Sequence, residues 1–499
     1  MRLIKNIKKG ILLLITCSAI VSCSDDFLDV NTSPNNPSFS TPSLTLPVAQ
    51  QSLLSLNATS MNYLGNFMTY SWSTPSNWSA NGNLIRYNVT TTFYSNIFET
   101  SYSSIFKNLT YVNNYEDGDI DYSAYKAISQ ILKAFQYQYL VDLYGDVPYT
   151  EANQRELNLT PKYDDAETVY KDLIDKLTSA AILATNLPDN YQDPEGQDII
   201  FGGDMNKWAA FANTIKLRML IRLSDTGQDS YITSEIAKIN ANAAGYITET
   251  VVGQPGYSDD TSKQNPFWGY VGKLPNDGEI TNRNDFTIAS DYIINLLSLN
   301  NDPRMERLFA EAKGGGYLGA EQSTILPGVG FTNDDTSHVG PGLLIGPDQD
   351  QPLMLLSEAQ FLQAEAMVRN YIPGGDAAAK DMYESAIKNS FEFLKVENAS
   401  TEAEDYYDQA ISNINWDSSS NKVQAIITQK WLALLGTSGI EPWIELTRTG
   451  FPTGLPIPAE SDGVRPVRLL YPASEVSRNS NNVPSQTQSD AFTSNPFWK

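Results

Sequence analysis

The segment SAYKAISQILKAFQYQYLVDLYG covers residues 123–145 and repeats its apolar side chains at every third or fourth position. Side chains with that spacing share one face of an α-helix, because the helix turns about once every 3.6 residues. Gly145 can end the helix, since glycine readily adopts the backbone angles of a C-terminal cap. The sequence therefore predicts an amphipathic helix over residues 123–144 that buries one face, formed by Ile128, Ile131, Leu132, Phe135 and Tyr139.

Further segments carry the same helical period. Asp204 and Asp376 precede two of them, and an aspartate side chain at that place can cap the first turn of a helix. The stronger predicted helices cover residues 204–219, 354–369, 376–394 and 421–435, and the weaker ones cover 44–69, 90–112, 164–184, 231–243 and 286–299. The expected fold class is all-α with paired helices of the tetratricopeptide type, although no strict repeat of about 34 residues can be read.

Long irregular segments separate the predicted helices. Residues 245–284, 313–352 and 450–499 each exceed the length of ordinary connections, and the second is rich in glycine. Loops of this length need a scaffold that holds them, or they form part of a binding surface. We expect a single all-α domain over residues 43–499, with large loops laid over one side of the helical core.

Cys23 follows a segment with the features of an export signal. Residues 1–22 begin with basic side chains, continue with a short apolar run and end on a small serine. The run is too short to span a bilayer, and Ile20-Val21-Ser22-Cys23 fits a bacterial lipobox. We expect lipidation of Cys23 and a polar, proline-rich tether over residues 23–42. An ordinary cleaved signal with a chance cysteine is the alternative.

The charge and residue counts disfavour several classes of function. With 34 Lys and Arg against 58 Asp and Glu, the formal net charge is −24, which argues against binding to nucleic acid or to anionic lipid surfaces. Cys17 falls within the signal and Cys23 is the only other cysteine, so we expect neither a disulfide nor a thiol nucleophile. His338 is the only histidine, which excludes multi-histidine zinc sites, and it forms no convincing Ser-His-Asp triad in the sequence.

Alternating aspartates at residues 117–121 have the spacing of a calcium loop. The sixth position is Tyr122 instead of glycine and the twelfth is Ile128 instead of glutamate, so an EF-hand is rejected. We expect an acidic turn instead, because negative charge is favourable near the N-terminus of the helix that follows. The sequence indicates no metal site and no cofactor.

Six motifs occur in a fixed order along the chain. They are residues 23–29 (CSDDFLD), 139–149 (YLVDLYGDVPY), 207–213 (KWAAFAN), 301–305 (NDPRM), 356–359 (LSEA) and 441–448 (EPWIELTR). Together they span nearly all of the chain after the signal, and the ordered set is more specific than any single motif. The set resembles the SusD/RagB family of nutrient-binding lipoproteins of Bacteroidetes outer membranes.

The resemblance implies a fold, a place in the cell and a partner. Its members have a SusD-like fold in which four tetratricopeptide-like hairpins support a loop-rich ligand-binding face. They bind oligosaccharides, in some cases peptides, and cap a SusC-like TonB-dependent transporter. Asp25 and Asp26 resemble the signal that sends such lipoproteins to the cell exterior. The resemblance therefore predicts a lipid-anchored outer-membrane protein that faces outward and delivers nutrient oligosaccharides to its transporter.

Aromatic residues beside amides or arginine in the loops are the expected ligand contacts. Aromatic faces pack on the C–H surfaces of sugars, and polar side chains bond to the hydroxyls. Residues 70–81 combine tryptophan with asparagine without a helical period, and residues 265–270, with polar residues 282–284 downstream, form a second such stretch. A tyrosine in the glycine-rich loop is a third candidate. The predicted ligand-binding residues are Trp72, Trp78, Asn81, Trp268, Tyr270, Arg283 and Tyr317.

A binding protein without catalytic residues is the function that we favour from the sequence. Peptide capture by the same fold is the first alternative. A secreted all-α glycoside hydrolase with two carboxylates is the less favoured one, since any chain with 58 acidic residues offers such pairs.

Overall fold

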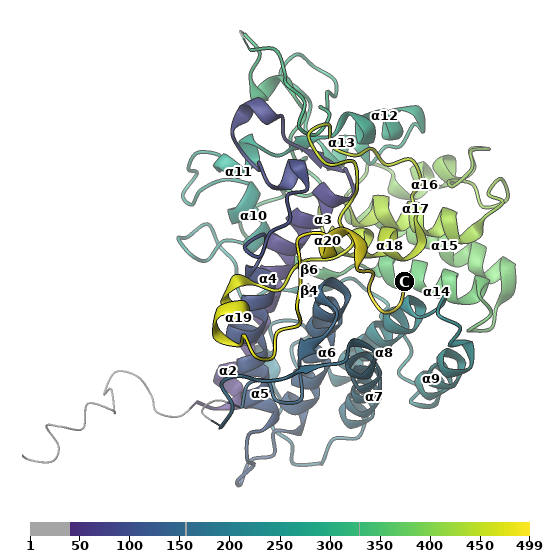
Figure 1. Ribbon diagram of the computed structural model, residues 1–499. Coiled ribbons are helices and arrows are strands. Elements are labelled where there is room, and N and C mark those ends of the chain that lie inside the picture. The colour runs from purple at the N-terminus through teal and green to yellow at the C-terminus, as the bar shows by residue number, and fades with distance from the viewer. Residues whose placement is uncertain (1–39, 155–156, 329) are drawn as a thin grey trace, which may run out of the picture. The chain divides into compact units, whose positions relative to one another are not determined.

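The computed structural model describes residues 40–154, 157–328 and 330–499. Contacts along the chain divide it into two units, Met1–Thr41 and Pro42–Lys499. The predicted signal, Cys23 and the tether up to residue 39 lie outside the described residues. The second unit, shown in Figure 1, is built mainly from helices.

Helices run through the whole second unit. Those of its first half are α2 (Pro42–Leu56), α3 (Asn62–Met68), α4 (Asn96–Thr100), α5 (Lys107–Asn113), α6 (Ser123–Tyr144), α7 (Ala166–Thr185), α8 (Met205–Arg222) and α9 (Asp229–Ala241). Those of its second half are α10 (Pro266–Val271), α11 (Asn282–Asp285), α12 (Asp291–Leu299), α13 (Met305–Leu308), α14 (Leu356–Val368), α15 (Gly375–Phe393), α16 (Ala399–Tyr407), α17 (Lys422–Leu434), α18 (Ile440–Thr449), α19 (Ala473–Arg478) and α20 (Asp490–Thr493). The predicted all-α fold class is confirmed.

The helix α6 begins and ends where its sequence pattern does. The side chains of its predicted apolar face are buried in the hydrophobic core. The start of α8 is also as predicted, because the Asp204 carboxylate accepts hydrogen bonds from the backbone N–H groups of Asn206 and Lys207. Strong periodicity combined with a capping residue therefore located these helices well.

Other helices differ from the predicted ones at their ends. Asp376 does not cap α15, which begins one residue earlier at Gly375; its carboxylate instead accepts a hydrogen bond from Trp416 Nε1 at 3.2 Å. The segment predicted as one helix over residues 44–69 is α2 and α3 joined by a π-helical turn, η2 (Asn57–Met61). The segment at residues 90–112 becomes helical only from Asn96.

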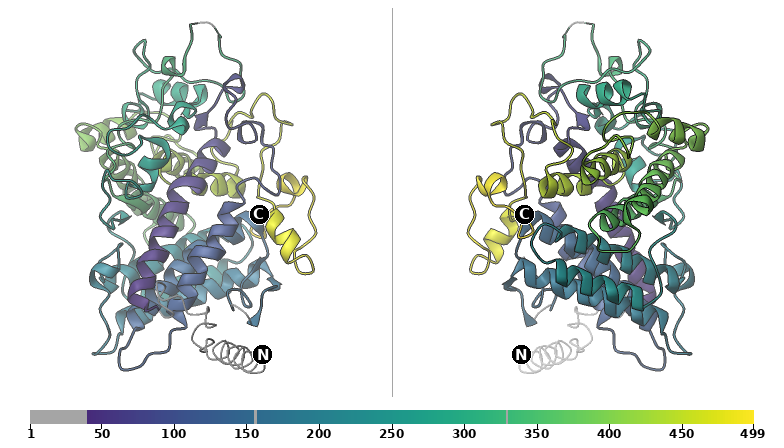
Figure 2. Two further views of the ribbon diagram at one scale, coloured as in Figure 1. Left: turned by 90° about the vertical axis from the view of Figure 1, so that its left-hand side faces the viewer. Right: turned by 90° about the vertical axis from the view of Figure 1, so that its right-hand side faces the viewer.

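The helices pack in two connected groups. Consecutive helices lie side by side in the pairs α6 with α7, α7 with α8, and α14 with α15, which are the expected hairpins. α8 also contacts α14, and this contact joins the groups. In Figure 1, α6 to α9 lie below α14 to α18, and Figure 2 shows the same two groups from the sides.

Short antiparallel strand pairs hold the loops onto the helices. β1 (Trp72–Ser73) pairs with β5 (Ile288–Ala289), with Trp72 opposite Ala289. The other pairs are β2 (Val147–Pro148) with β3 (Tyr163–Asp164) and β4 (Val251–Gly253) with β6 (Gln351–Met354). The β1–β5 pair brings the loop after α3 beside the chain that follows α11, so two of the stretches predicted to bind ligand meet.

A network of charged side chains is buried where α8, α17 and α18 meet. The Arg222 guanidinium donates to Glu441 at 2.8 Å and to Glu445 at 2.5 Å. Lys430 Nζ lies 3.0 Å from Glu441, and Arg448 donates to Glu445 and to Glu365. Charges removed from water in this way are tolerated because each has an opposite charge and hydrogen bonds within reach.

Along the described residues, no helix combines the length and the apolar character that crossing a membrane requires.

Candidate functional site

Three of the predicted ligand-binding residues converge on Tyr63, a residue of α3. The Arg283 guanidinium carbon lies 4.0 Å from the ring centroid of Tyr270 and 5.0 Å from that of Tyr63. The two tyrosine rings meet edge to face at 5.7 Å. Asn81 joins them through a hydrogen bond from its Nδ2 to the Tyr63 hydroxyl at 2.8 Å. We call these four residues, Tyr63, Asn81, Tyr270 and Arg283, the ligand cluster.

A chain of hydrogen bonds, each with a defined donor, holds the residues of the ligand cluster in place. The Thr287 hydroxyl donates to the Arg283 carbonyl at 2.6 Å, which uses its only proton. The 2.8 Å contact between the Thr287 and Tyr63 hydroxyls therefore has Tyr63 as its donor. Since Asn81 donates to the Tyr63 oxygen, the order is Asn81, Tyr63, Thr287 and the Arg283 backbone. This chain couples the loop after β1 to α11.

The Arg283 side chain keeps its hydrogen-bond donors available. In the described part of the chain its guanidinium has no carboxylate within ion-pair distance, and its recorded contacts are the two aromatic rings. The residue is half-buried, as are Asn81 and Tyr270. Stacking on aromatic faces orients a guanidinium without using its N–H groups. The cluster can therefore donate hydrogen bonds to hydroxyl or carboxylate oxygens of a ligand.

The tyrosine hydroxyls of the cluster stay protonated at neutral pH. Burial raises the pKa of Tyr63, opposed by its hydrogen bond with Thr287 and by the charge of Arg283. Burial likewise raises the pKa of Tyr270, again opposed by Arg283. Both groups are therefore neutral, and the only formal charge in the cluster is that of the guanidinium.

Trp72 requires a correction, because the sequence places it among the ligand contacts and its side chain is 0% exposed. Its ring lies 5.6 Å from Tyr63 and stacks at 6.5 Å on Phe267 of α10. A ring with no exposed surface offers no face to a sugar. Trp72 instead supports the ligand cluster from the core side.

The remaining predicted residues do not belong to the ligand cluster. Trp78, in the short 3-10 helix η3 (Ser76–Trp78), is half-buried on a loop held by the hydrogen bond from Asn77 Nδ2 to the Leu326 carbonyl at 3.2 Å. Trp268 lies on α10 and is half-buried, and its buried Nε1 has no hydrogen-bond partner among the described residues. Tyr317 lines a different cavity of about 540 Å³, where burial and then the charges of Glu306 and Glu311 raise its pKa.

Sequence reasoning missed Tyr63 and Thr287. Tyr63 falls inside a segment whose period predicts a helix and hence a core position, and it is indeed only 1% exposed. Its role comes from the contacts of its hydroxyl, which the helical spacing of apolar residues does not predict. Thr287 carries no sequence signal, because its contacts depend on the pairing of β1 with β5.

His338 links the glycine-rich loop to α11. Its Nδ1 lies 2.9 Å from the Asn284 carbonyl oxygen and its Nε2 lies 3.0 Å from that of Asn333. Asn333 Nδ2 also donates to the Asp285 carboxylate at 2.8 Å. These contacts hold the helix that carries Arg283 against the loop at residues 313–352.

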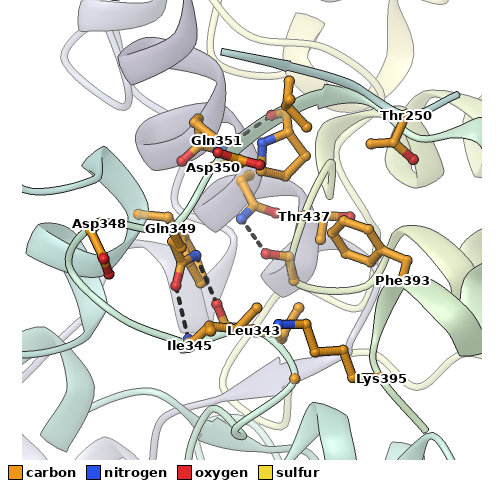
Figure 3. Close-up of a pocket in the computed structure, with 16 residues that line it drawn as sticks. Thr250, Leu343, Ile345, Asp348, Gln349, Asp350, Gln351, Phe393, Lys395 and Thr437 are labelled. Atoms are coloured by element: carbon orange, nitrogen blue, oxygen red, sulfur yellow. Dashed lines mark hydrogen bonds between the residues drawn. The ribbon is translucent and has the colours of Figure 1, made fainter. Parts of the chain in front are cut away.

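Another cavity measures about 480 Å³. Figure 3 shows the residues that line it. Phe267 of α10 lines it, together with residues of β6 and of the loop before it. Figure 3 places Phe393 and Lys395 across the cavity from Asp348. Much of its polar lining is bonded within the protein: Gln349 accepts from the Ile345 backbone N–H at 2.8 Å and donates to the Leu343 carbonyl. The cavity is therefore a less evident ligand site than the ligand cluster.

Metal binding finds no support in the described part of the chain. No group of three or more His, Cys, Asp or Glu side chains there has an arrangement that could hold an ion.

Solved structures share this fold. A SusD/RagB family protein from Bacteroides thetaiotaomicron is 19% identical, with a TM-score of 0.74 over 92% of this chain and 99% of that one. A chitin-binding SusD homolog from Flavobacterium johnsoniae is 22% identical, with a TM-score of 0.71 over 88% and 94%. A SusD homolog from Bacteroides uniformis is also 22% identical, with a TM-score of 0.71 over 91% and 99%. At these identities the likeness shows the fold.

A family model places the chain more directly. No curated protein sequence matches it. Residues 34–472 match the model of a SusD-like family described as "Starch-binding associating with outer membrane". The match covers most of the chain, which confirms the family that the sequence motifs predict. The chain belongs to this SusD-like family.

Proposed function

We propose that this protein is a cell-surface lipoprotein that binds nutrient oligosaccharides at the ligand cluster. The observation that carries the proposal is the Arg283 guanidinium, stacked 4.0 Å from the Tyr270 ring centre with no carboxylate partner among the described residues. Sugar hydroxyls accept hydrogen bonds from such a group. The Tyr63 ring, which Asn81 fixes through its hydroxyl, holds the guanidinium in place. Arg283 covers one face of Tyr270. The half-buried rings of Trp78, three residues before Asn81, and of Trp268, two residues before Tyr270, are the further stacking faces in this proposal.

Chitin oligomers are the first ligands to test. The names of two structurally similar proteins describe them as chitin-binding, and one of these is the Flavobacterium johnsoniae homolog. The likeness concerns the fold, so the ligand of this chain has to be found by a panel. The panel contains oligomers of N-acetylglucosamine, starch fragments, other plant glycans and mixed peptides.

Membrane attachment and a transporter partner complete the proposal. Lipidation at Cys23 attaches the chain to the outer membrane, and Asp25 and Asp26 direct it outward. A SusC-like TonB-dependent transporter receives the captured ligand. The family description, which mentions association with the outer membrane, supports this placement.

The composition of the cluster favours binding over hydrolysis. A glycoside hydrolase needs two carboxyl groups about 5 to 9.5 Å apart on either side of the bond. The ligand cluster has two phenols, one amide and one guanidinium, and therefore no such pair. We assign no catalytic residue to it.

Isothermal titration with the panel tests the proposal. A glycan should bind to the wild-type protein, and Arg283→Ala should lower its affinity at least about tenfold, the loss of about 1.4 kcal/mol expected for one charged hydrogen bond. Trp78→Ala should also lower the affinity about tenfold, while the protein stays folded. Tyr317→Ala is the matched control and should leave binding unchanged. Binding of peptides alone, or turnover of a glycan, would contradict the proposal.

A further inference from the structure

A third cavity, larger than the two already described, lies away from the ligand cluster. It measures about 1250 Å³ and is bounded by α5, α6, α7 and the turn after β2. It shares no lining residue with the ligand cluster, and Figure 1 shows α5 and α7 below α10 and α11. Its volume exceeds the range of about 300 to 1,000 Å³ that is common for small-molecule sites. Tyrosines and amides line much of it, namely Tyr102, Tyr111, Tyr115, Tyr149, Asn113, Asn114 and Asn153.

Lys133 brings an uncompensated positive charge to this cavity. It extends from α6, and its Nζ donates a hydrogen bond to the Thr110 hydroxyl of α5 at 2.9 Å. Within the residues that the structure describes, that nitrogen forms no ion pair with a carboxylate. Burial and then the charge of Lys176 lower the pKa of Lys133 to about 8, so the amine is mainly charged at neutral pH. An ammonium has three N–H donors, and at most one of them is used here.

The carboxylates of the cavity wall are engaged elsewhere. Asp164 accepts hydrogen bonds from the backbone N–H groups of Tyr149 and Thr150. Asp172 pairs with Lys176 at 2.7 Å, and Glu475 accepts from the Tyr163 hydroxyl at 2.9 Å. Glu116 and Lys107 are exposed. The cavity as a whole is therefore not positive, and its capacity for an anion is confined to the point where Lys133 projects.

We propose that this cavity is a second binding site, which takes a saccharide that bears a carboxylate and pairs that carboxylate with the Lys133 ammonium. A half-buried charge without an opposite charge nearby is costly, and a bound carboxylate would supply that opposite charge. The Tyr102 and Tyr149 hydroxyls donate within the protein, to Pro148 and Asp172, but their oxygens can still accept from sugar hydroxyls. Asn153 Oδ1 is buried and has no hydrogen-bond partner among the described residues, so it can accept as well. The tyrosine rings can pack on the C–H faces of the sugar. The proposal does not depend on the ligand cluster or on the ligand that it binds.

The test compares two disaccharides that differ in one group. Cellobiouronic acid has a carboxylate where cellobiose has a CH₂OH group, so the difference in affinity isolates the charge. Isothermal titration with the full-length protein should show saturable binding of the acid and at least about tenfold weaker binding of the neutral sugar. Affinity for the acid should fall between pH 7 and pH 9, since Lys133 loses its proton above a pKa of about 8.

Variants assign the contact to Lys133. Lys133→Met should lower the affinity for the acid at least about tenfold without lowering the melting temperature, because it removes a charge that has no partner in the free protein. Lys107→Met makes the same chemical change at an exposed position of the same cavity and should have no effect. Arg283→Ala should leave binding of the acid unchanged and so separates this site from the ligand cluster.

Four results would each overturn the proposal. They are no binding of cellobiouronic acid to the wild-type protein, equal affinity for cellobiose, unchanged affinity in Lys133→Met, and loss of acid binding in Arg283→Ala. The last result would mean that the acid binds at the ligand cluster.

Discussion

Arg222 and Arg283 show two ways in which this protein holds an arginine. Arg222 is 0% exposed, and its guanidinium donates to the carboxylates of Glu441 and Glu445. Arg283 is half-buried and lies against the rings of Tyr270 and Tyr63, with no carboxylate within reach among the described residues. The side chains are chemically identical, so the difference between them lies entirely in their neighbours.

The neighbours decide what each arginine can do. Carboxylates accept from both Nη atoms of Arg222, and the whole group is buried, so it can only contribute to the stability and geometry of the fold. Aromatic rings fix the position of Arg283 and leave its N–H groups for a ligand. We therefore expect changes in the buried network to alter unfolding, and changes in the ligand cluster to alter affinity.

The largest effect is expected for Glu445→Ala. Glu445 accepts from Arg222 at 2.5 Å and from Arg448 Nε at 2.9 Å, and its Oε1 lies 3.3 Å from Lys430 Nζ. Removing it leaves these buried cations with less negative charge, which should lower the free energy of unfolding by about 3 to 5 kcal/mol. Chemical denaturation measures the change. Glu445→Gln keeps the shape of the side chain and should lose less; an unfolding midpoint unchanged in the alanine variant would contradict a stabilising role for the network.

The second prediction uses the pH dependence of the same network. Burial raises the pKa of Asp142 to about 6, an effect that Arg222 at 3.5 Å opposes only in part. A carboxyl with a raised pKa in the folded state holds its proton more tightly there than in the unfolded chain. Its contribution to stability is therefore greatest below pH 4 and falls by about 3 kcal/mol as the pH rises from about 4 to about 6.

Asp142→Asn isolates this contribution, because all other carboxylates are the same in both proteins. The variant should gain stability relative to the wild type as the pH rises from 4 to 6, measured by denaturation at each pH. Trp498 Nε1 donates to Asp142 at 2.7 Å, and the asparagine oxygen can still accept that bond. A constant difference between the two proteins across this range would show that folding does not raise the pKa of Asp142.

The third prediction concerns Arg283→Lys, which keeps the charge but removes the planar group. A lysine cannot stack on Tyr270 and Tyr63 while presenting several fixed donors, so affinity for the glycan identified by the panel should fall about tenfold. The free energy of unfolding should change by no more than about 1 kcal/mol, the value of an exposed cation–π contact. Arg222→Lys is the matched variant in the buried network. A larger loss of stability in Arg283→Lys than in Arg222→Lys would reverse the comparison.

The sequence predicts the scaffold better than it predicts the ligand cluster, for a physical reason. A helix such as α6 is determined by apolar spacing within 22 consecutive residues, and α8 adds its Asp204 cap. The ligand cluster instead joins Tyr63 to Arg283, which are far apart in the chain. Their approach depends on the pairing of β1 with β5, two strands of two residues each, too short to leave an alternating pattern.

Trp72 is a residue that the sequence wrongly predicts to be exposed, again because of contacts between distant segments. Its surroundings in the sequence are polar and lack a helical period, which predicts exposure, but Phe267 of α10 packs on it from a distant part of the chain. Asn81, Tyr270 and Arg283 are predicted as ligand contacts because their residue types fit sugar binding wherever the loops lie, and that role stays a prediction. Which of the predicted residues meet could not be inferred, because that depends on contacts between loops.

The smallest effect is expected for Tyr63→Phe. Tyr63 is buried, as the charged network around Arg222 is, but it belongs to the ligand cluster. Its hydroxyl relays a hydrogen bond from Asn81 to Thr287 beneath Arg283. Removing the hydroxyl should lower the free energy of unfolding by about 1 kcal/mol, because the half-buried Asn81 amide and the buried Thr287 hydroxyl each lose a partner. Glycan affinity should fall severalfold, less than in Arg283→Lys, because the ring on which the guanidinium stacks remains.

Measuring both stability and affinity in Tyr63→Phe shows whether the Tyr63 hydroxyl only positions the ligand cluster or also touches the ligand. If the hydroxyl only positions the cluster, Asn81→Ala should reduce affinity by a similar factor, and the double variant should lose little more than either single one, since both break the same chain. Additive losses would mean that Asn81 and Tyr63 each touch the ligand. In that case the binding surface would include Tyr63, which lies beneath Arg283, and Tyr63 would be a residue that contacts the sugar.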